Sequence, residues 1–221
     1  MVWTENPIFF VDFEGSRASG VLEYGVATLL GGKIVETKTR ICAATGPVSA
    51  QDTNIHGLGA DELEGAATLA ADWDYFAGLR ERGPFAAHYA GAENSLIKSV
   101  WPYPRRSPDF VRLGGWIVDW GPWIDTARIY AQLYPQFESG RLEELVRAAR
   151  LQGELDLHAA SHCPADRRCY HSALYDALAG ALLLGSLARL SQCAGLSVGQ
   201  LLALSTLDGQ KRDRMGQGEL W

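Results

Sequence analysis

The chain has 221 residues, of which 47% are hydrophobic and 21% charged, so it is long enough and apolar enough to bury a substantial core. This composition excludes wholesale disorder, and the lack of any charge-free apolar run of about 18 residues excludes a membrane span. The net charge of −6 excludes a strongly basic coat for nucleic acid. The acidic excess lies in residues 1–104, so a polyanion would need local arginines or bound cations.

The cysteines and the N-terminus predict a cellular compartment. Four cysteines in a chain of this length do not form a disulfide scaffold, and they suit a reducing environment. The first residues lack a basic segment followed by a long apolar stretch, so no signal peptide is expected. These two features predict a cytoplasmic protein.

Three strand-like runs open the chain. Residues 8–14 are apolar and aromatic, which favours a strand buried on both faces. Residues 21–30 and 33–42 flank Gly31 and Gly32, and this pattern predicts a β-hairpin. We therefore expect three consecutive antiparallel strands.

Helices and short strands are expected to alternate after this meander. Strands are predicted at 85–88 and 116–118, and irregular polar segments at 45–59 and 152–170. Helices are predicted at 60–82, at 93–100, from an N-cap at Asp125 or Thr126, at 141–151, at 172–190 and at 197–204. This order predicts one α/β domain over residues 1–205, in which helices pack on a mixed sheet, followed by a short polar tail at 206–221.

Two acids end the first predicted strand. Asp12 and Glu14 are two residues apart, so both side chains point to one face of the strand. Adjacent carboxylates on a buried strand repel each other, and a divalent cation relieves both the repulsion and the cost of burial. The simpler interpretation is a strand that ends in solvent, and the spacing alone favours it.

A second acid lies on the apolar helix near the end of the chain. Within that helix, Asp176 shares a stripe with Ala173, Ala177 and Gly180, which are all small. Such a stripe lets the helix approach a sheet closely and bring the carboxylate to it. His171 precedes the helix, where it is free to point into a cleft. A third acid, Glu93, opens the helix at 93–100, where the helix dipole alone would explain it.

Together these segments resemble the DnaQ-like (DEDDh) 3′–5′ exonucleases of the ribonuclease H-like superfamily. Asp12-Phe13-Glu14 matches the family's first motif, and His171 with Asp176 matches its last. Residues 54–58 and 124–126 resemble its Ile-His-Gly and Val-Asp-Thr segments, in the right order. The middle motif departs from the pattern, because Glu93 stands where the family has a metal-binding aspartate and Tyr89 where it has an asparagine.

The resemblance implies a ribonuclease H-like sheet, completed by parallel strands, and two-metal hydrolysis of phosphodiester bonds at the 3′ end of DNA or RNA. It implies that two Mg²⁺ or Mn²⁺ ions are held by four carboxylates, with a histidine as the general base. The implied metal ligands are Asp12, Glu14, Glu93 and Asp176, and the implied base is His171. Single-stranded DNA is slightly favoured as substrate, and the sequence does not tell whether the protein has a protein partner.

The resemblance also implies residues that contact the terminal nucleotide. Phe13, Gly15 and Ser16 lie where the family grips it, although strand alternation points the Phe13 side chain to the core, so that its backbone would make the contact. His56 and Leu58 are expected to form a wall of the nucleotide pocket. Phosphate contacts are expected from four loop arginines: Arg105, Arg106, Arg167 and Arg168.

Three alternatives remain open at this point. His158, His162, Cys163, Cys169 and His171 lie close enough in sequence to suggest a zinc site. Glu93 leaves room for a degenerate ribonuclease H-like module that binds nucleic acid or a protein without cutting. An RNA substrate is also possible, since two-metal cleavage needs no 2′-hydroxyl.

Overall fold

The computed structural model describes residues 1–112, 114–137 and 139–206. Its centre is a five-stranded mixed sheet with the strand order β3-β2-β1-β4-β7. β1 and β2 pair antiparallel, as do β2 and β3, whereas β4 runs parallel to both β1 and β7. The strands are β1 (Ile8–Ser16), β2 (Gly20–Leu30), β3 (Lys33–Ile41), β4 (Phe85–Ala87) and β7 (Ile124–Asp125). The predicted antiparallel meander and mixed sheet are confirmed.

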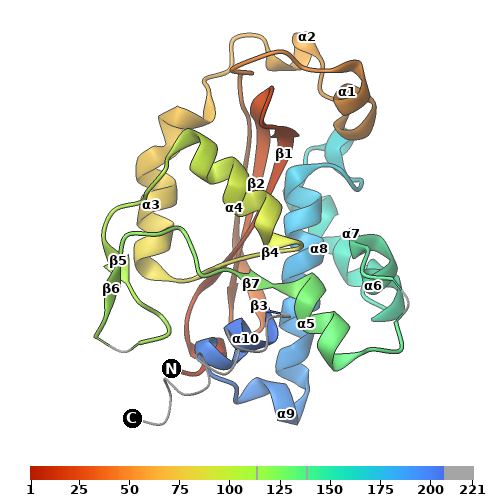
Figure 1. Cartoon of the computed structure of the whole chain (residues 1–221). Helices are drawn as coiled ribbons and strands as arrows, with labels where there is room; N and C mark the ends of the chain where they lie inside the picture. Colours follow the sequence, from red (N-terminus) through yellow and green to blue (C-terminus); the bar gives the residue numbers. More distant parts are fainter. Residues whose placement is uncertain (113, 138, 207–221) are drawn as a thin grey trace.

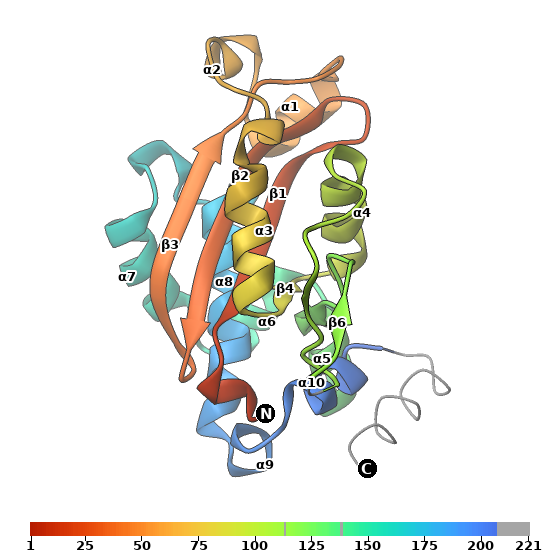
Figure 2. The same cartoon turned by 90° about the vertical axis from the view of Figure 1, so that its left-hand side faces the viewer.

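Helices cover both faces of the sheet (Figures 1 and 2). The long helix α8 (Ala173–Ser186) crosses one face, and α3 (Trp73–Arg82) with α4 (Ala90–Val100) covers the other. The side chains of β1 alternate accordingly. Phe9, Val11 and Phe13 join the core under α3 and α4, whereas Ile8 and Phe10 join the core under α8.

Shorter elements complete the layers. They are η1 (Trp3–Glu5), α1 (Ala50–His56), α2 (Ala60–Leu63), η2 (Leu69–Asp72), β5 (Ser107–Pro108), β6 (Trp116–Ile117), α5 (Thr126–Leu133), α6 (Leu142–Ala148), α7 (Gln152–His162), η3 (Ala165–Arg167), η4 (Leu187–Arg189), α9 (Ser191–Ala194) and α10 (Val198–Leu204). β5 and β6 form a separate two-stranded sheet. No helix in the described ranges is long and apolar enough to cross a membrane.

Small residues let α8 approach the sheet. A Cβ at Gly25 of β2 would lie 2.2 Å from the carbonyl oxygen of Ala173, and a Cβ at Gly180 would lie 2.1 Å from the ring of Phe10. Neither position accepts a side chain, so glycine is required at both points of contact. The small-residue stripe predicted for this helix therefore packs directly on the strands, and it brings Asp176 to the sheet.

The predicted helix at 60–82 is wrong. The chain forms α2, η2 and α3 there, and Gly65 between them has a left-handed backbone (φ 72°). The loop predicted at 45–59 contains α1, which is capped by a hydrogen bond from the Asp52 N–H to the Ser49 side chain. The irregular segment predicted at 152–170 contains α7. Of the predicted tail at 206–221, residues 207–221 lie outside the described residues.

Candidate functional site

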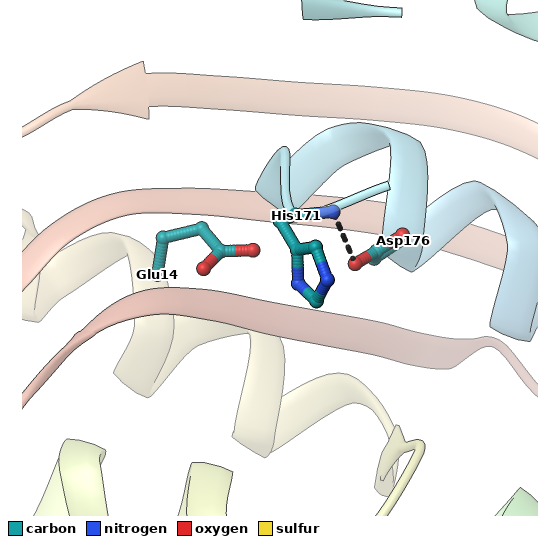
Figure 3. Close-up of side chains that lie close together, drawn as sticks. All are labelled: Glu14, His171 and Asp176. Atoms are coloured by element: carbon teal, nitrogen blue, oxygen red, sulfur yellow. Dashed lines mark hydrogen bonds between the residues drawn. The ribbon is translucent and has the colours of Figure 1, made fainter. Parts of the chain in front are cut away.

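The first strand and the last long helix bring three side chains together. They are Glu14 of β1, His171 just before α8, and Asp176 of α8. Each offers one potential ligand atom, and these atoms lie within 4.8 Å of one another. Figure 3 shows the imidazole of His171 between the two carboxylates. The backbone N–H of His171 donates to Asp176 Oδ2 at 3.0 Å, and His171 has a left-handed backbone (φ 65°). This turn at the start of α8 aims the ring at the acids.

Asp12 and Glu93 border this group without belonging to it. Asp12 shares the face of Glu14 on β1, and Glu93 reaches the strand from α4. Glu93 is 6% exposed, and its Oε2 accepts the backbone N–H of Phe13 at 2.9 Å. Two elements on opposite faces of the sheet therefore deliver carboxylates to β1.

The start of α4 is fixed by an aspartate from a neighbouring strand. Asp125 at the end of β7 accepts the backbone N–H of Tyr89 at 3.3 Å and that of Ala90 at 3.1 Å. It also caps α5 by accepting the N–H of Arg128 at 3.3 Å, which confirms its predicted role as an N-cap. One buried carboxylate thus caps two helices, and it orients the helix that carries Glu93.

The carboxylates of the site have strongly perturbed acidities. Burial raises the pKa of Glu14 to about 8, and the charge of Asp176 adds to the rise. Burial likewise raises the pKa of Glu93 to about 8 and that of Asp176 to about 7. The pKa of Asp12 lies well above its ordinary value, first through burial and then through the charge of Glu93. Without a cation, the four groups cannot all be ionised at neutral pH at low cost.

The donor set fits a hard divalent cation. Asp176 Oδ1 is buried and has no hydrogen-bond partner. Within the described ranges, no lysine or arginine forms an ion pair with Asp12, Glu14, Glu93 or Asp176. Carboxylate oxygens without a basic partner are the ligands that Mg²⁺ and Mn²⁺ prefer. The residues present therefore suit the ions that the family resemblance implies.

Two cavities meet at His171. One, of about 540 Å³, is lined by residues that include Asp12, Tyr89, Arg141, His171 and Asp176. The other, of about 650 Å³, is lined by residues that include Glu23, His56, Leu58, Arg167 and His171. His171 therefore lies where the two cavities adjoin.

His56 lies at the C-terminal end of α1 and is 4% exposed. Its Nδ1 accepts the backbone N–H of Leu58 at 3.1 Å, so Nε2 carries the proton, and that buried donor has no partner. Burial lowers the pKa of His56, which favours the neutral ring. A hydrogen-bond donor therefore lies at the larger cavity with nothing to donate to.

A buried ion pair that the sequence did not reveal supports this second cavity. Arg167 pairs with Glu23 of β2, which is 2% exposed, and Arg167 Nη1 donates to the backbone oxygen of His56 at 2.6 Å. The N–H of Ala173 at the start of α8 also donates to Glu23, at 3.1 Å. This network joins α1, β2 and α8 around the cavity. In the sequence, the only indication of this network is a glutamate, Glu23, within an otherwise apolar predicted strand.

Comparison with known proteins gives the architecture a precedent. No protein-family model matches the sequence, and no curated protein matches it. A structure of exonuclease X in complex with 5′ overhanging duplex DNA superposes with a TM-score of 0.64 at 20% identity, and the match covers 90% of this chain and 99% of that chain. The chain has the DnaQ-like exonuclease fold.

Two further structures agree. A 3′-exonuclease bound to a histone mRNA stem-loop matches with a TM-score of 0.63 at 11% identity, over 87% of this chain and 66% of that one. E. coli exonuclease I with a dT13 oligonucleotide matches with a TM-score of 0.57 at 13% identity, over 83% of this chain and 41% of that one. At these low identities, the likeness shows a shared fold and no more.

The remaining predicted substrate residues lie elsewhere in this fold. The Phe13 side chain is 5% exposed and packs on Phe76, as strand alternation predicts. Gly15 and Ser16 end β1, and Ser16 hydrogen bonds with Ser19 at the turn into β2. Neither of the two cavities is lined by these three predicted residues.

Most of the predicted phosphate contacts are already engaged. Arg105 pairs with Asp74, and Arg168 donates to backbone oxygens of α7 and the residue after it. Arg106 lies over the ring of Trp116, 5.3 Å from its centroid. The zinc alternative finds no support, because the one cluster of three or more metal-ligating side chains among the described residues is Glu14, His171 and Asp176.

Proposed function

We propose that this protein is a metal-dependent 3′–5′ exonuclease that hydrolyses phosphodiester bonds at the 3′ end of nucleic acid, with single-stranded DNA slightly favoured over RNA. The observation that carries the proposal is the convergence of Glu14, His171 and Asp176, bordered by Asp12 and Glu93, on the DnaQ-like fold. Solved structures of this fold include exonucleases in complex with duplex DNA, with dT13 and with an mRNA stem-loop.

The four carboxylates would hold two Mg²⁺ or Mn²⁺ ions. Such ions, when bound, polarise the scissile phosphate, generate hydroxide from water at neutral pH and stabilise the leaving oxygen. Asp176 has an unpartnered buried Oδ1 to offer. Glu93 keeps Oε1 for a ligand while Oε2 is held by the Phe13 N–H. The longer side chain of Glu93 is therefore compatible with a metal site.

His171 would take the proton of the attacking water. Its side chain is exposed, whereas its backbone is tied to Asp176, so the ring is accessible to water and fixed in direction. Histidine exchanges protons near neutral pH, which suits a general base in this reaction. Its place between Glu14 and Asp176 puts the base next to the proposed ligands.

The larger cavity would receive the terminal nucleotide. The unpartnered Nε2–H of His56 offers a hydrogen bond to a nucleotide oxygen or nitrogen, and Leu58 offers an apolar wall. Phe13, Gly15 and Ser16 do not line this cavity, and the sequence predicts that they contact the nucleotide from the end of β1, Phe13 through its backbone. Each of these roles follows the expectation from the sequence.

Degradation of labelled strands tests the proposal. Single-stranded DNA and its RNA counterpart, each labelled at the 5′ end, are incubated with Mg²⁺, Mn²⁺ or EDTA. We expect a ladder that shortens from the 3′ end with either metal and no cleavage with EDTA. The relative rates on the two strands give the preferred sugar.

Two variants distinguish cleavage by the proposed site from cleavage by a contaminating nuclease. Asp12→Asn should abolish the ladder. Asp61→Asn makes the same charge change at an exposed position of α2 and should leave the ladder intact. A folded wild-type protein that binds both strands and cleaves neither with any metal would overturn the proposal and favour a non-cleaving binding module.

A further inference from the structure

The smaller cavity is lined by an arginine and a tyrosine that have no role in the proposed hydrolysis. Arg141 and Tyr89 line it together with Asp12, His171 and Asp176. Both side chains are exposed, Tyr89 at 47%. Within the part of the chain that the structure describes, Arg141 forms no ion pair with a carboxylate, and its neighbour Glu143 is paired with Arg147 at 2.6 Å.

The backbone segment before Arg141 is tied to the segment that carries Tyr89. The Nε2–H of His88 donates to the carbonyl oxygen of Gly140 at 2.8 Å, while its Nδ1 lies 2.9 Å from the Thr126 hydroxyl. The carbonyl can only accept, so the proton is on Nε2, and this bond ties the residue before Arg141 to the end of β4. A Cβ on Gly140 would lie 2.7 Å from the Tyr89 hydroxyl, so the tyrosine packs closely on the same segment.

We propose that Arg141 and Tyr89 form a subsite for the nucleotide on the 5′ side of the scissile bond. This inference rests on the proposed exonuclease function. A strand whose terminal phosphodiester lies at the carboxylates leads its next phosphate into the cavity they share with Arg141. A guanidinium binds phosphate through paired N–H donors, and an exposed tyrosine face stacks on an unpaired base. The subsite therefore selects 3′ ends that are single-stranded over at least two nucleotides.

Two substrates separate this subsite from the chemistry. The p-nitrophenyl ester of thymidine 5′-monophosphate has a scissile bond and no upstream nucleotide, whereas an oligothymidylate has both. The quantity compared is the ratio of kcat/KM for the oligomer to kcat/KM for the ester. A loss of folded protein or of bound metal lowers both values of kcat/KM by the same factor, so it does not change this ratio.

We expect Arg141→Gln to lower the ratio about tenfold, mostly through KM, as for the loss of one good phosphate contact. The salt dependence of oligomer binding should become shallower by about 0.7, the value for one phosphate of a single strand. Tyr89→Asn, which suits the left-handed backbone at that position (φ 61°), should lower the ratio by removing the stacking face. Arg150→Gln, an equal charge change at an exposed position beyond the other end of α6, should not change it.

An oligonucleotide in which one phosphate is replaced by an uncharged methylphosphonate shows which phosphate Arg141 contacts. A methylphosphonate placed immediately 5′ of the terminal phosphodiester should slow the first cleavage by wild type about as much as Arg141→Gln does, and should slow Arg141→Gln no further. Hydrolysis of both substrates with an unchanged ratio in Arg141→Gln would overturn the subsite while leaving the exonuclease standing. A wild-type protein that hydrolyses neither substrate would overturn the exonuclease itself.

Discussion

Two buried glutamates lie directly opposite each other on neighbouring strands, and only one of them forms an ion pair within the described residues. Glu14 of β1 is paired in register with Glu23 of β2. Glu23 has an arginine, Arg167, and a backbone N–H from Ala173. Glu14 has no such ion pair among the described residues, and it lies with Asp176 and His171 instead.

The difference separates a carboxylate with a structural role from a cluster that we propose binds divalent cations. A buried charge is tolerated when it is paired and hydrogen bonded, as Glu23 is. The carboxyl groups of Glu14, Glu93 and Asp176 have raised pKa values, first because they are buried, and none of the three forms an ion pair within the described residues. We infer that the missing positive charge comes from divalent ions, and the predictions below test this contrast.

The largest effect is expected in activity. Asp176→Asn removes a charged ligand at the unpartnered position and should lower kcat/KM on single-stranded DNA about 10³-fold, the size of loss that follows removal of a preorganised electrostatic group. Single-turnover cleavage measures it. A loss below tenfold would show that Asp176 is not needed for the reaction.

The next effect concerns stability. Glu23→Gln breaks a buried ion pair and should cost about 3 kcal/mol, which lowers Tm by about 6–12 °C. The double variant Glu23→Leu with Arg167→Met should recover most of this loss, because neither charge is left alone. In metal-free protein, Glu14→Gln should instead raise Tm, and thermal unfolding without metal compares the three variants. A fall of Tm in Glu14→Gln as large as in Glu23→Gln would erase the contrast.

The acid cluster should also give metal-free protein an unusual dependence on pH. Carboxyl groups with a folded pKa of about 7 to 8 and an unfolded pKa near 4 favour folding in their protonated form. Their contribution is fully present below pH 4 and is lost as pH rises toward 8. We expect Tm in EDTA to fall by at least about 3 °C between pH 6 and pH 8. Saturating Mg²⁺ should remove most of that fall, and an equal fall with Mg²⁺ would contradict a cation site.

The smallest effect is expected at Glu93. Glu93→Asp shortens the side chain by one methylene, so it cannot both accept the Phe13 N–H and reach the ions as the glutamate does. We expect metal affinity to fall about tenfold, a size typical of a disturbed ligand environment. Titration of activity with Mn²⁺ measures this change. Tighter binding in the variant would mean that the glutamate itself weakens the site.

Local patterns in the sequence predicted much of this arrangement. The two-residue spacing of Asp12 and Glu14 set their common face, and the small stripe at Ala173, Ala177 and Gly180 predicted the close approach of α8. These features depend on residues near in sequence. The mixed sheet followed from the opening meander and from the resemblance that these motifs carry.

Other features depend on contacts that no local pattern shows. Arg167 and Glu23 are 144 residues apart, and each looks like an ordinary charged residue until the chain is folded. Helix α7 buries only Leu155 and Ala159, so its sequence has almost no apolar stripe to recognise. The Arg141 subsite likewise arises from a hydrogen bond between His88 and a distant glycine carbonyl, 52 residues away.

The most direct test of the contrast is Mn²⁺ binding followed by electron paramagnetic resonance. Wild type, Asp176→Asn and Glu23→Gln are titrated under conditions where all three are folded. We expect wild type and Glu23→Gln to bind Mn²⁺ with similar affinity and Asp176→Asn to bind it at least about 10-fold more weakly. Binding that is unchanged in Asp176→Asn, or absent in wild type, would show that the acid cluster is not a cation site.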